Sequence, residues 1–133
     1  LYIFIDELGD LVTEAPPITK QLGRIAKLGR AANIHLIAGT QNPNRKTLSA
    51  DFLGNCPARA ALRCDDPIES RQIIKYPDAV NLPEHGYALY KCPQIIGAPQ
   101  LVKIPYYDDS ELAARVKWWT DQNKQARRRW WQR

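Results

Sequence analysis

Two short apolar runs, each followed directly by polar residues, constrain the fold of this chain most strongly. The first run is Leu1-Tyr2-Ile3-Phe4-Ile5 and precedes Asp6-Glu7, and the second is Ile34-His35-Leu36-Ile37-Ala38 and precedes Gly39-Thr40-Gln41. Runs that carry β-branched and aromatic residues on successive positions are typical of strands buried on both faces in a parallel sheet. We therefore expect a sheet whose first two strands end in polar side chains.

Helical segments are predicted between and after these runs. Pro16-Pro17 begins a helix in which apolar residues recur at helical spacing, and this helix ends near Gly29. A short helix is expected over 47–53 and a third strand over 58–64. A further helix starts at Asp66, because an acidic N-cap residue there precedes a proline at the first helical position.

The last third of the chain carries two more strand signals and one long helix. Residues 87–91 and 94–104 resemble antiparallel strands joined by a proline turn, which indicates a hairpin at a sheet edge. Asp109 or Ser110 caps a helix that runs to about residue 125. The alternation of strands and helices predicts an α/β fold with a mostly parallel sheet flanked by helices, an edge hairpin and a C-terminal helix.

The composition fits one compact globular body. The chain has 133 residues, of which 44% are hydrophobic and 25% charged. Within it we expect a main body over 1–107 and a C-terminal amphipathic helix with a basic, tryptophan-rich tail over 108–133. The chain contains no methionine, and its first residue already lies in the strongest strand signal. We therefore expect it to be part of a longer protein.

Several classes of protein are disfavoured by the same composition. No apolar run approaches the roughly 20 residues that span a bilayer. The 3 cysteines are odd in number and widely spaced, without a Cys-x-x-Cys pair, so the sequence suggests neither a disulfide framework nor a zinc site. We expect a cytoplasmic location, which includes the cytoplasmic side of a membrane-anchored parent protein.

The net charge of +5 is unevenly distributed along the chain. The tail from Lys124 to Arg133 holds five cations and no carboxylate, and it includes Trp130 and Trp131. Cations and indoles together are suited to nucleic acid, because cations neutralise phosphates and indoles stack on bases. The alternative is the end of an interaction helix that packs elsewhere in the full protein, and the sequence leaves both open.

The first candidate site is the pair of carboxylates at Asp6-Glu7. Both follow a buried strand, at the sheet edge where open α/β folds bind ligands. In P-loop NTPases an acid at this point helps to hold the Mg²⁺ that bridges two phosphates, and a neighbouring Glu polarises the attacking water. The alternative is a solvated acidic turn, and we expect Asp10 to belong to the turn that follows.

Two further polar positions are candidates for phosphate chemistry. Thr40-Gln41 ends the second strand at the same edge, and the amide of Gln41 can both donate and accept, so it can orient a water molecule or detect a phosphate. Arg30 lies at the exit of the preceding helix. A cation there either stabilises the helix C-terminus or serves as an arginine finger.

Taken together, the motifs closely resemble the second half of the motor domain of FtsK/SpoIIIE-type DNA translocases, from the Walker B acid onward. They resemble less closely the wider HerA-like group, which includes conjugative coupling proteins. The resemblance covers about residues 1–91 and rests on six motifs in order: Asp6 to Leu11, Gly29 to Leu36, Thr40 to Pro43, Asn55 to Arg59, Asp66 to Arg71, and the apolar strand before the first of these. It implies part of a RecA-like P-loop ATPase domain.

The resemblance also implies roles for individual residues. Asp6 matches the acid that binds Mg²⁺ through water, and Glu7 matches the catalytic carboxylate that activates water. Thr40 lies beside the nucleotide, and Gln41 matches the sensor glutamine. Arg30 matches an arginine that reaches the nucleotide of the neighbouring subunit, so the resemblance implies ATP and Mg²⁺ as cofactors and a homo-hexameric ring.

The expected partner is double-stranded DNA in the pore of that ring. The family often has an arginine after the sensor glutamine, whereas this chain has Asn42, with Arg45 and Lys46 downstream as substitutes. Arg71 matches another pore-loop arginine. The acidic pair Asp65-Asp66 departs from the basic or neutral approach to phosphate that the family would lead us to expect.

The phosphate-binding loop of such enzymes, Gly-x-x-x-x-Gly-Lys-Ser/Thr, does not occur in these 133 residues. We expect it upstream in the parent, which would be the ATPase, whereas the isolated chain would be a monomer that neither binds nor hydrolyses ATP. Two other readings stay open at this point: a non-catalytic remnant that binds DNA or a protein, and a secretion-type ATPase that moves protein.

Overall fold

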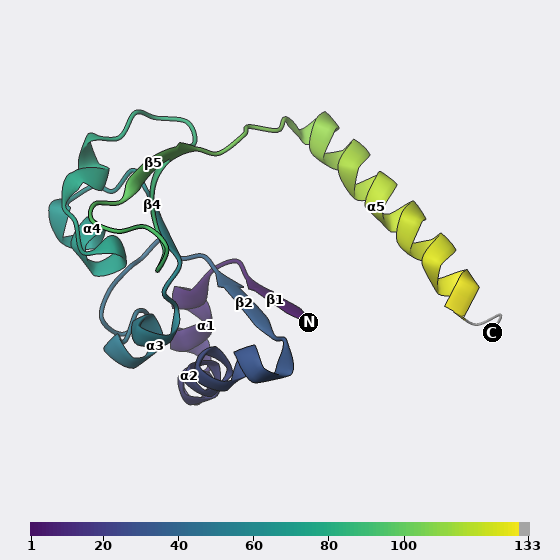
Figure 1. Ribbon diagram of the computed structural model, residues 1–133, viewed down its shortest axis with the longest axis horizontal. Coiled ribbons are helices and arrows are strands. Elements are labelled where there is room, and N and C mark those ends of the chain that lie inside the picture. Colours follow the sequence, from purple (N-terminus) through teal and green to yellow (C-terminus); the bar gives the residue numbers. More distant parts are fainter. Residues whose placement is uncertain (131–133) are drawn as a thin grey trace. The chain divides into compact units, whose positions relative to one another are not determined.

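The computed structural model describes the backbone of residues 1–130 and the side chains of residues 1–124 (Figure 1). The chain forms two compact units, Leu1–Lys103 and Ile104–Arg133. No helix within the described residues is long and apolar enough to cross a membrane. The side chains of Trp130 and Trp131, in the predicted basic tail, lie outside the described part.

A parallel pair of strands with three helices forms the N-terminal part of the first unit. The elements are β1 (Tyr2–Ile5), α1 (Leu8–Glu14), α2 (Ile18–Leu28), the 3₁₀ helix η1 (Gly29–Ala32), β2 (His35–Ala38) and α3 (Ala50–Asn55). The register of the parallel pair aligns Tyr2 with His35 and Ile5 with Ala38. The two strands and the helix after Pro16-Pro17 are thus confirmed. Helix α1 was missed, because Asp10 and its neighbours read as a turn.

The core of this part lies on one side of the parallel pair. Leu8, Leu22 and Phe52 are buried, and Ile5 and Leu36 pack against them. Successive side chains of a strand point to opposite faces, so the other face carries Tyr2 and Phe4, which are 63% and 72% exposed. The expectation that the first strand is buried on both faces is therefore wrong for this chain, because helices cover only one face.

A three-stranded antiparallel sheet forms the rest of the first unit. Its elements are β3 (Arg59–Leu62), α4 (Pro67–Ile74), the 3₁₀ helix η2 (Asp78–Asn81), β4 (Tyr87–Lys91) and β5 (Gln100–Lys103), in the strand order β3-β4-β5. The predicted hairpin is confirmed. The third strand pairs with this hairpin, so parallel pairing among the described strands is confined to β1 and β2. Ala61 and Ala88 are fully buried, and Ile74 of α4 lies in the same core.

One side chain connects the two parts of this unit. Arg59, at the start of β3, donates from Nε to the carbonyl of Cys56 (2.9 Å), from Nη1 to that of Ile73 (3.1 Å) and from Nη2 to that of Leu53. These carbonyls lie at the C-terminal ends of α3 and α4, where no intrahelical donor is available. Arg59 therefore caps two helices at once, a role that the sequence pattern does not indicate.

Both predicted N-caps can be checked against hydrogen bonds. Asp66 caps α4 as expected, because its carboxylate accepts from the backbone N–H groups of Ile68 and Glu69. In the second unit, α5 (Asp109–Trp130) is capped one residue before the predicted position. Asp108 accepts from the hydroxyl of Ser110 (2.6 Å) and the N–H of Glu111 (2.8 Å), and these bonds lower the pKa of Asp108.

The parallel pair depends on a close approach at Gly39. A Cβ atom on this residue would lie 2.8 Å from the backbone oxygen of Asp6, which cannot move without distorting β1. We expect Gly39→Ala to lower the free energy of unfolding by about 1–3 kcal/mol, the usual cost of overpacking. Gly54→Ala, at a helical position where a Cβ would meet nothing within 4 Å, is the control and should raise stability by about 0.5–1 kcal/mol. Chemical denaturation of both variants measures the difference, and equal stabilities would contradict it.

Candidate functional site

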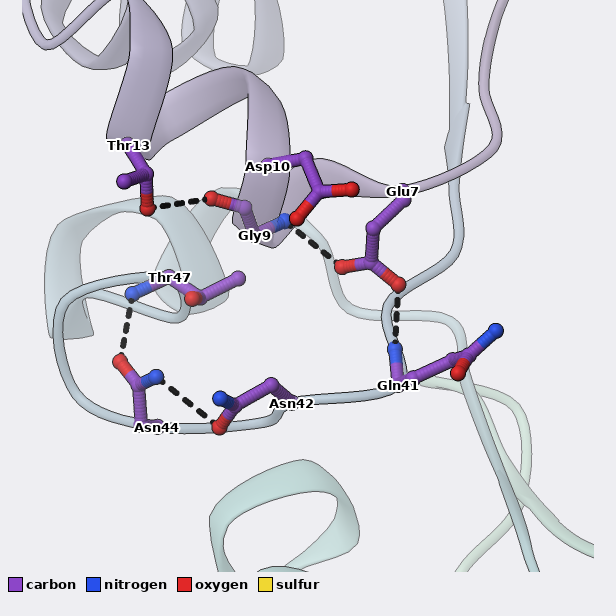
Figure 2. Close-up of a pocket in the computed structure, with 8 residues that line it drawn as sticks. All are labelled: Glu7, Gly9, Asp10, Thr13, Gln41, Asn42, Asn44 and Thr47. Atoms are coloured by element: carbon purple, nitrogen blue, oxygen red, sulfur yellow. Dashed lines mark hydrogen bonds between the residues drawn. The ribbon is translucent and has the colours of Figure 1, made fainter.

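The carboxyl ends of β1 and β2 lie at one edge of the parallel pair, and a cavity of about 290 Å³ opens there. The cavity is lined by one glycine and seven polar residues from the segments that follow the two strands (Figure 2). They are Glu7, Gly9, Asp10, Thr13, Gln41, Asn42, Asn44 and Thr47. Glu7 and Gln41 were predicted for this edge, and the fold brings them together. Asp10 lies in α1 rather than in a turn, and it faces the same cavity.

The Glu7 carboxylate is the best-organised group of the site. Its Oε1 accepts from the backbone N–H of Gly9 (2.8 Å) and from the hydroxyl of Thr40 (2.6 Å), and its Oε2 accepts from the backbone N–H of Gln41 (2.6 Å). The bond to Gly9 makes Glu7 the N-cap of α1. The Thr40 hydroxyl and the two N–H groups lower the pKa of Glu7, against a smaller opposing effect of burial. Glu7 is therefore an ionised carboxylate with a fixed orientation.

The turn after β2 forms the wall of the cavity opposite Glu7. Asn44 accepts at Oδ1 from the backbone N–H groups of Lys46 (2.8 Å) and Thr47 (3.0 Å), and it donates from Nδ2 to Asn42 Oδ1 (3.0 Å). The N–H of Asn42 in turn donates to Thr40 Oγ1 (3.1 Å). Sequence reasoning missed Asn44. The signal was its place just after Pro43, since asparagine in such a loop bonds its own backbone two or three residues on.

Gln41 contributes a backbone bond that was not predicted, and the role of its side chain stays a prediction. Its backbone N–H holds Glu7, whereas its side-chain amide points away from the Glu7 carboxylate (Figure 2). The side chain is exposed and makes no hydrogen bond with any residue that the structure describes. An amide in this position is free to meet a ligand.

Asp6 is not among the residues that line the cavity, and its role toward Mg²⁺ stays a prediction. Its side chain is exposed, and among the described residues it enters no ion pair or hydrogen bond. No cluster of three or more His, Cys, Asp or Glu side chains occurs in the described part of the chain. Mg²⁺ does not require one, because it is commonly held by one or two carboxylates together with substrate phosphates and water. A single free carboxylate at this edge therefore matches the chemistry of that ion.

The fold separates Arg30 from these groups. Arg30 lies in η1, before the first residue of β2, whereas Thr40 and Gln41 follow its last residue. Four residues of strand at about 3.3 Å each put roughly 13 Å between the two ends. Arg30 is exposed and is not among the residues that line the cavity.

The candidate DNA-binding residues fall on two elements. Arg45 and Lys46 are exposed in the turn after β2, and Asn42 lies in the same turn with its side chain bonded to Asn44. Arg71 is exposed on helix α4 rather than in a loop at a strand end. The resemblance matches Arg71 to a pore-loop arginine, whereas the structure places it on a helix, because the Asp66 cap starts α4 before it.

The geometry around Glu7 predicts the effect of a single methyl group. A Cβ atom at Gly9 would lie 2.8 Å from Glu7 Oε1, so Gly9→Ala should push the carboxylate away from Thr40 and Gln41. Thermal stability should change little, because alanine is favoured over glycine in a helix by about 1 kcal/mol and offsets the weakened cap. The amide proton of Gln41 should exchange with solvent several-fold faster, which NMR can measure. Unchanged exchange would mean that Glu7 does not hold this amide.

Comparisons with known proteins agree with this arrangement. The chain is 31% identical over 115 residues to a DNA translocase FtsK of Chlorobaculum tepidum, covering 86% of this chain and 14% of that protein. It is 35% identical over 115 residues to a DNA translocase FtsK of Leptospira interrogans, covering 84% of this chain and 12% of that protein. No family model matches the chain. The chain thus corresponds to a small part of these relatives.

Two solved structures share the fold. One is the pCW3 conjugation coupling protein TcpA, in monomer form with ATPγS, with a TM-score of 0.73, 27% identity, and coverage of 82% of this chain and 33% of that one. The other is the cytoplasmic domain of the Thermomonospora curvata type VII secretion ATPase EccC, with a TM-score of 0.71, 26% identity, and coverage of 84% and 13%. The chain is therefore homologous to FtsK-type DNA translocases over most of its length, and its fold is part of a RecA-like P-loop ATPase domain.

Proposed function

We propose that this chain forms the part of an ATP-driven DNA translocase that activates water for hydrolysis. The observation that carries the proposal is the Glu7 carboxylate, which three donors fix at the strand edge of a polar cavity. Its relatives named DNA translocase are about six to seven times as long, since the 115 aligned residues are 14% and 12% of them. The remaining parts of the site, including the phosphate-binding loop, would come from elsewhere in the full-length protein.

In this proposal Glu7 accepts a proton from the attacking water. A carboxylate offers about four acceptor sites, and three are occupied, which leaves one on Oε2 for water. Asp6 would hold Mg²⁺ through water, and the bound ion would supply positive charge that neutralises the phosphates. The exposed side chain of Gln41 would meet the terminal phosphate.

Arg30 would act on a neighbouring subunit. It lies at the opposite edge of the parallel pair from its own Glu7, roughly 13 Å away along β2. A guanidinium that cannot reach its own site but is exposed can reach the site of the next subunit in a ring. A homo-hexamer is the assembly that we propose, with a cytoplasmic location where ATP and DNA are both present.

DNA would be bound by loops and short helices rather than by a recognition helix that docks in a groove of the duplex. Arg45 and Lys46 are exposed in the turn that borders the cavity, and Arg71 is exposed on α4. Such cations contact phosphate and carry no sequence information. Binding to double-stranded DNA would then be independent of sequence and steeply dependent on salt.

Complementation between mutants tests the catalytic part of the proposal. In the full-length protein, Glu7→Gln should retain nucleotide binding and abolish turnover, because it removes the base and keeps the shape. Arg30→Ala should lower turnover by about 10³-fold with ATP affinity nearly intact. Mixing the two variants should restore part of the ATPase activity. Arg24→Ala, a nearby exposed cation on α2, is the control and should have wild-type turnover. Mixed rings without any recovered activity would exclude action between subunits.

A triple substitution tests the DNA contacts. Removing Arg45, Lys46 and Arg71 together should weaken DNA binding and flatten the salt dependence by about one unit for each lost phosphate contact. The matched control removes three exposed cations of α2 and should leave both quantities unchanged; these are Lys20, Arg24 and Lys27. Fluorescence anisotropy with duplexes of unrelated sequence at several salt concentrations gives both. If the two triple variants behaved alike, the DNA assignment would be wrong.

A second function has a specific observation in its favour. The fold is shared with a type VII secretion ATPase at a TM-score of 0.71, close to the value for the conjugation coupling protein. A motor that moves protein would use the same cavity without Arg45 and Lys46 touching DNA. Stimulation of ATP hydrolysis by duplex DNA in the full-length protein favours the translocase, and its absence favours the protein-moving motor.

A further inference from the structure

We propose that Thr40 is the positioning residue of the Glu7 carboxylate and that the turn over residues 42–47 controls it. This inference rests on the proposed role of Glu7 as the base. It assigns to Thr40 a task different from contact with nucleotide, and it connects the backbone of Lys46, next to Arg45 in the chain, to the Glu7 carboxylate through a continuous series of hydrogen bonds.

The Thr40 hydroxyl is hydrogen-bonded both as a donor and as an acceptor. It has one proton, which it donates to Glu7 Oε1 at 2.6 Å, and its oxygen accepts from the N–H of Asn42 at 3.1 Å. A hydroxyl otherwise rotates to suit any partner, whereas here the N–H of Asn42 fixes the acceptor side and Glu7 fixes the donor side. The position of the Asn42 backbone therefore determines where the Thr40 proton points.

The Glu7 carboxylate depends on this proton for its orientation. The N–H of Gly9 and the Thr40 hydroxyl both meet Oε1, which occupies that oxygen and leaves the free acceptor site on Oε2. Rotation of the carboxylate would exchange the two oxygens and break bonds to Gly9, Thr40 and Gln41 at once. Of the three donors to the Glu7 carboxylate, Thr40 donates from its side chain, whereas Gly9 and Gln41 donate from backbone N–H groups.

The turn over residues 42–47 is held by the hydrogen bonds of Asn44 and by the buried Thr47, and the two residues between them are exposed. Asn44 bonds the Asn42 side chain and the N–H groups of Lys46 and Thr47, and Thr47 is buried with 5% of its surface exposed. Arg45 and Lys46 lie between these anchors with exposed side chains. In this proposal a shift of the backbone at Lys46 would change the position of the Asn44 side chain. Asn44 would in turn shift Asn42, whose N–H bonds the Thr40 hydroxyl.

Backbone amide exchange in this 133-residue chain tests the series directly. Thr40→Val removes the hydroxyl and keeps the shape, so the amides of Gly9, Gln41 and Asn42 should exchange roughly fivefold faster or more. Thr40→Ser keeps the hydroxyl and should restore exchange to within about twofold of the original. Thr13→Val is the matched control, because its hydroxyl lines the same cavity but bonds only the Gly9 carbonyl (2.8 Å). It should leave the Gln41 and Asn42 amides unchanged.

The second arm tests control by the turn. Asn44→Ala leaves Thr40 and Glu7 intact and should nevertheless speed exchange at Gly9 and Gln41. If Thr40→Val fails to fold, this variant alone decides. Exchange at Gly9 and Gln41 that stays at the original rate in Asn44→Ala, or a Thr40→Ser variant as impaired as Thr40→Val, would overturn the proposal.

A kinetic arm separates this inference from the proposed function. In the full-length protein Thr40→Val should lower kcat on the order of tenfold with KM for ATP nearly unchanged, and Thr40→Ser should recover kcat. If the amides respond as expected but Glu7→Gln retains turnover, Thr40 positions Glu7 and the catalytic role of Glu7 is wrong. If Glu7→Gln abolishes turnover and Thr40→Val changes neither kcat nor the exchange rates of the amides, the catalytic role of Glu7 is supported and the positioning role of Thr40 is wrong.

Discussion

The close approach of Gly39 to the backbone of Asp6 is the constraint on which the rest of the structure depends. The N–H of Gly39 donates to the carbonyl of Ile5, and the carbonyl of Gly39 accepts from the N–H of Leu8, so one residue joins the end of β1, the end of β2 and the start of α1. The absence of a side chain allows both bonds at once. Glu7 and Thr40 lie on either side of this junction, and their contact follows from it.

Glu7 illustrates how one group serves both stability and chemistry. As the N-cap of α1 it satisfies a donor that the helix cannot satisfy itself, and as a carboxylate at a strand edge it faces the cavity. The same hydrogen bonds that lower its pKa keep it ionised, which suits a group that must accept a proton but weakens it as a base. In the proposed mechanism, the fixed position of Glu7 close to the reacting water would offset its weaker basicity.

The sequence predicts the strands and their polar ends well, because apolar runs followed by Asp6-Glu7 and Thr40-Gln41 carry the signal locally. It also locates the helix start at Asp66, where the cap and the proline are adjacent. Helix α1 escapes prediction because it is only 7 residues long and Asp10 reads as a turn, although Leu8, Leu11 and Val12 recur at helical spacing and pack into one core. The pairing of β3 with β4 joins segments that are distant in the sequence, which no local pattern records, whereas the bonds of Asn44 are local and could have been anticipated from its place after Pro43.

The double cap made by Arg59 has a mechanical consequence for the first unit. Three hydrogen bonds from one planar group connect the ends of α3 and α4, so neither helix end can slide past the other without breaking bonds to a charged donor. The guanidinium of Arg59 thus joins α3, which packs with the parallel pair, to α4, which packs with the antiparallel sheet. A shift of the end of α3 relative to that of α4 would therefore have to break bonds of Arg59, whereas a shift of both ends together would not.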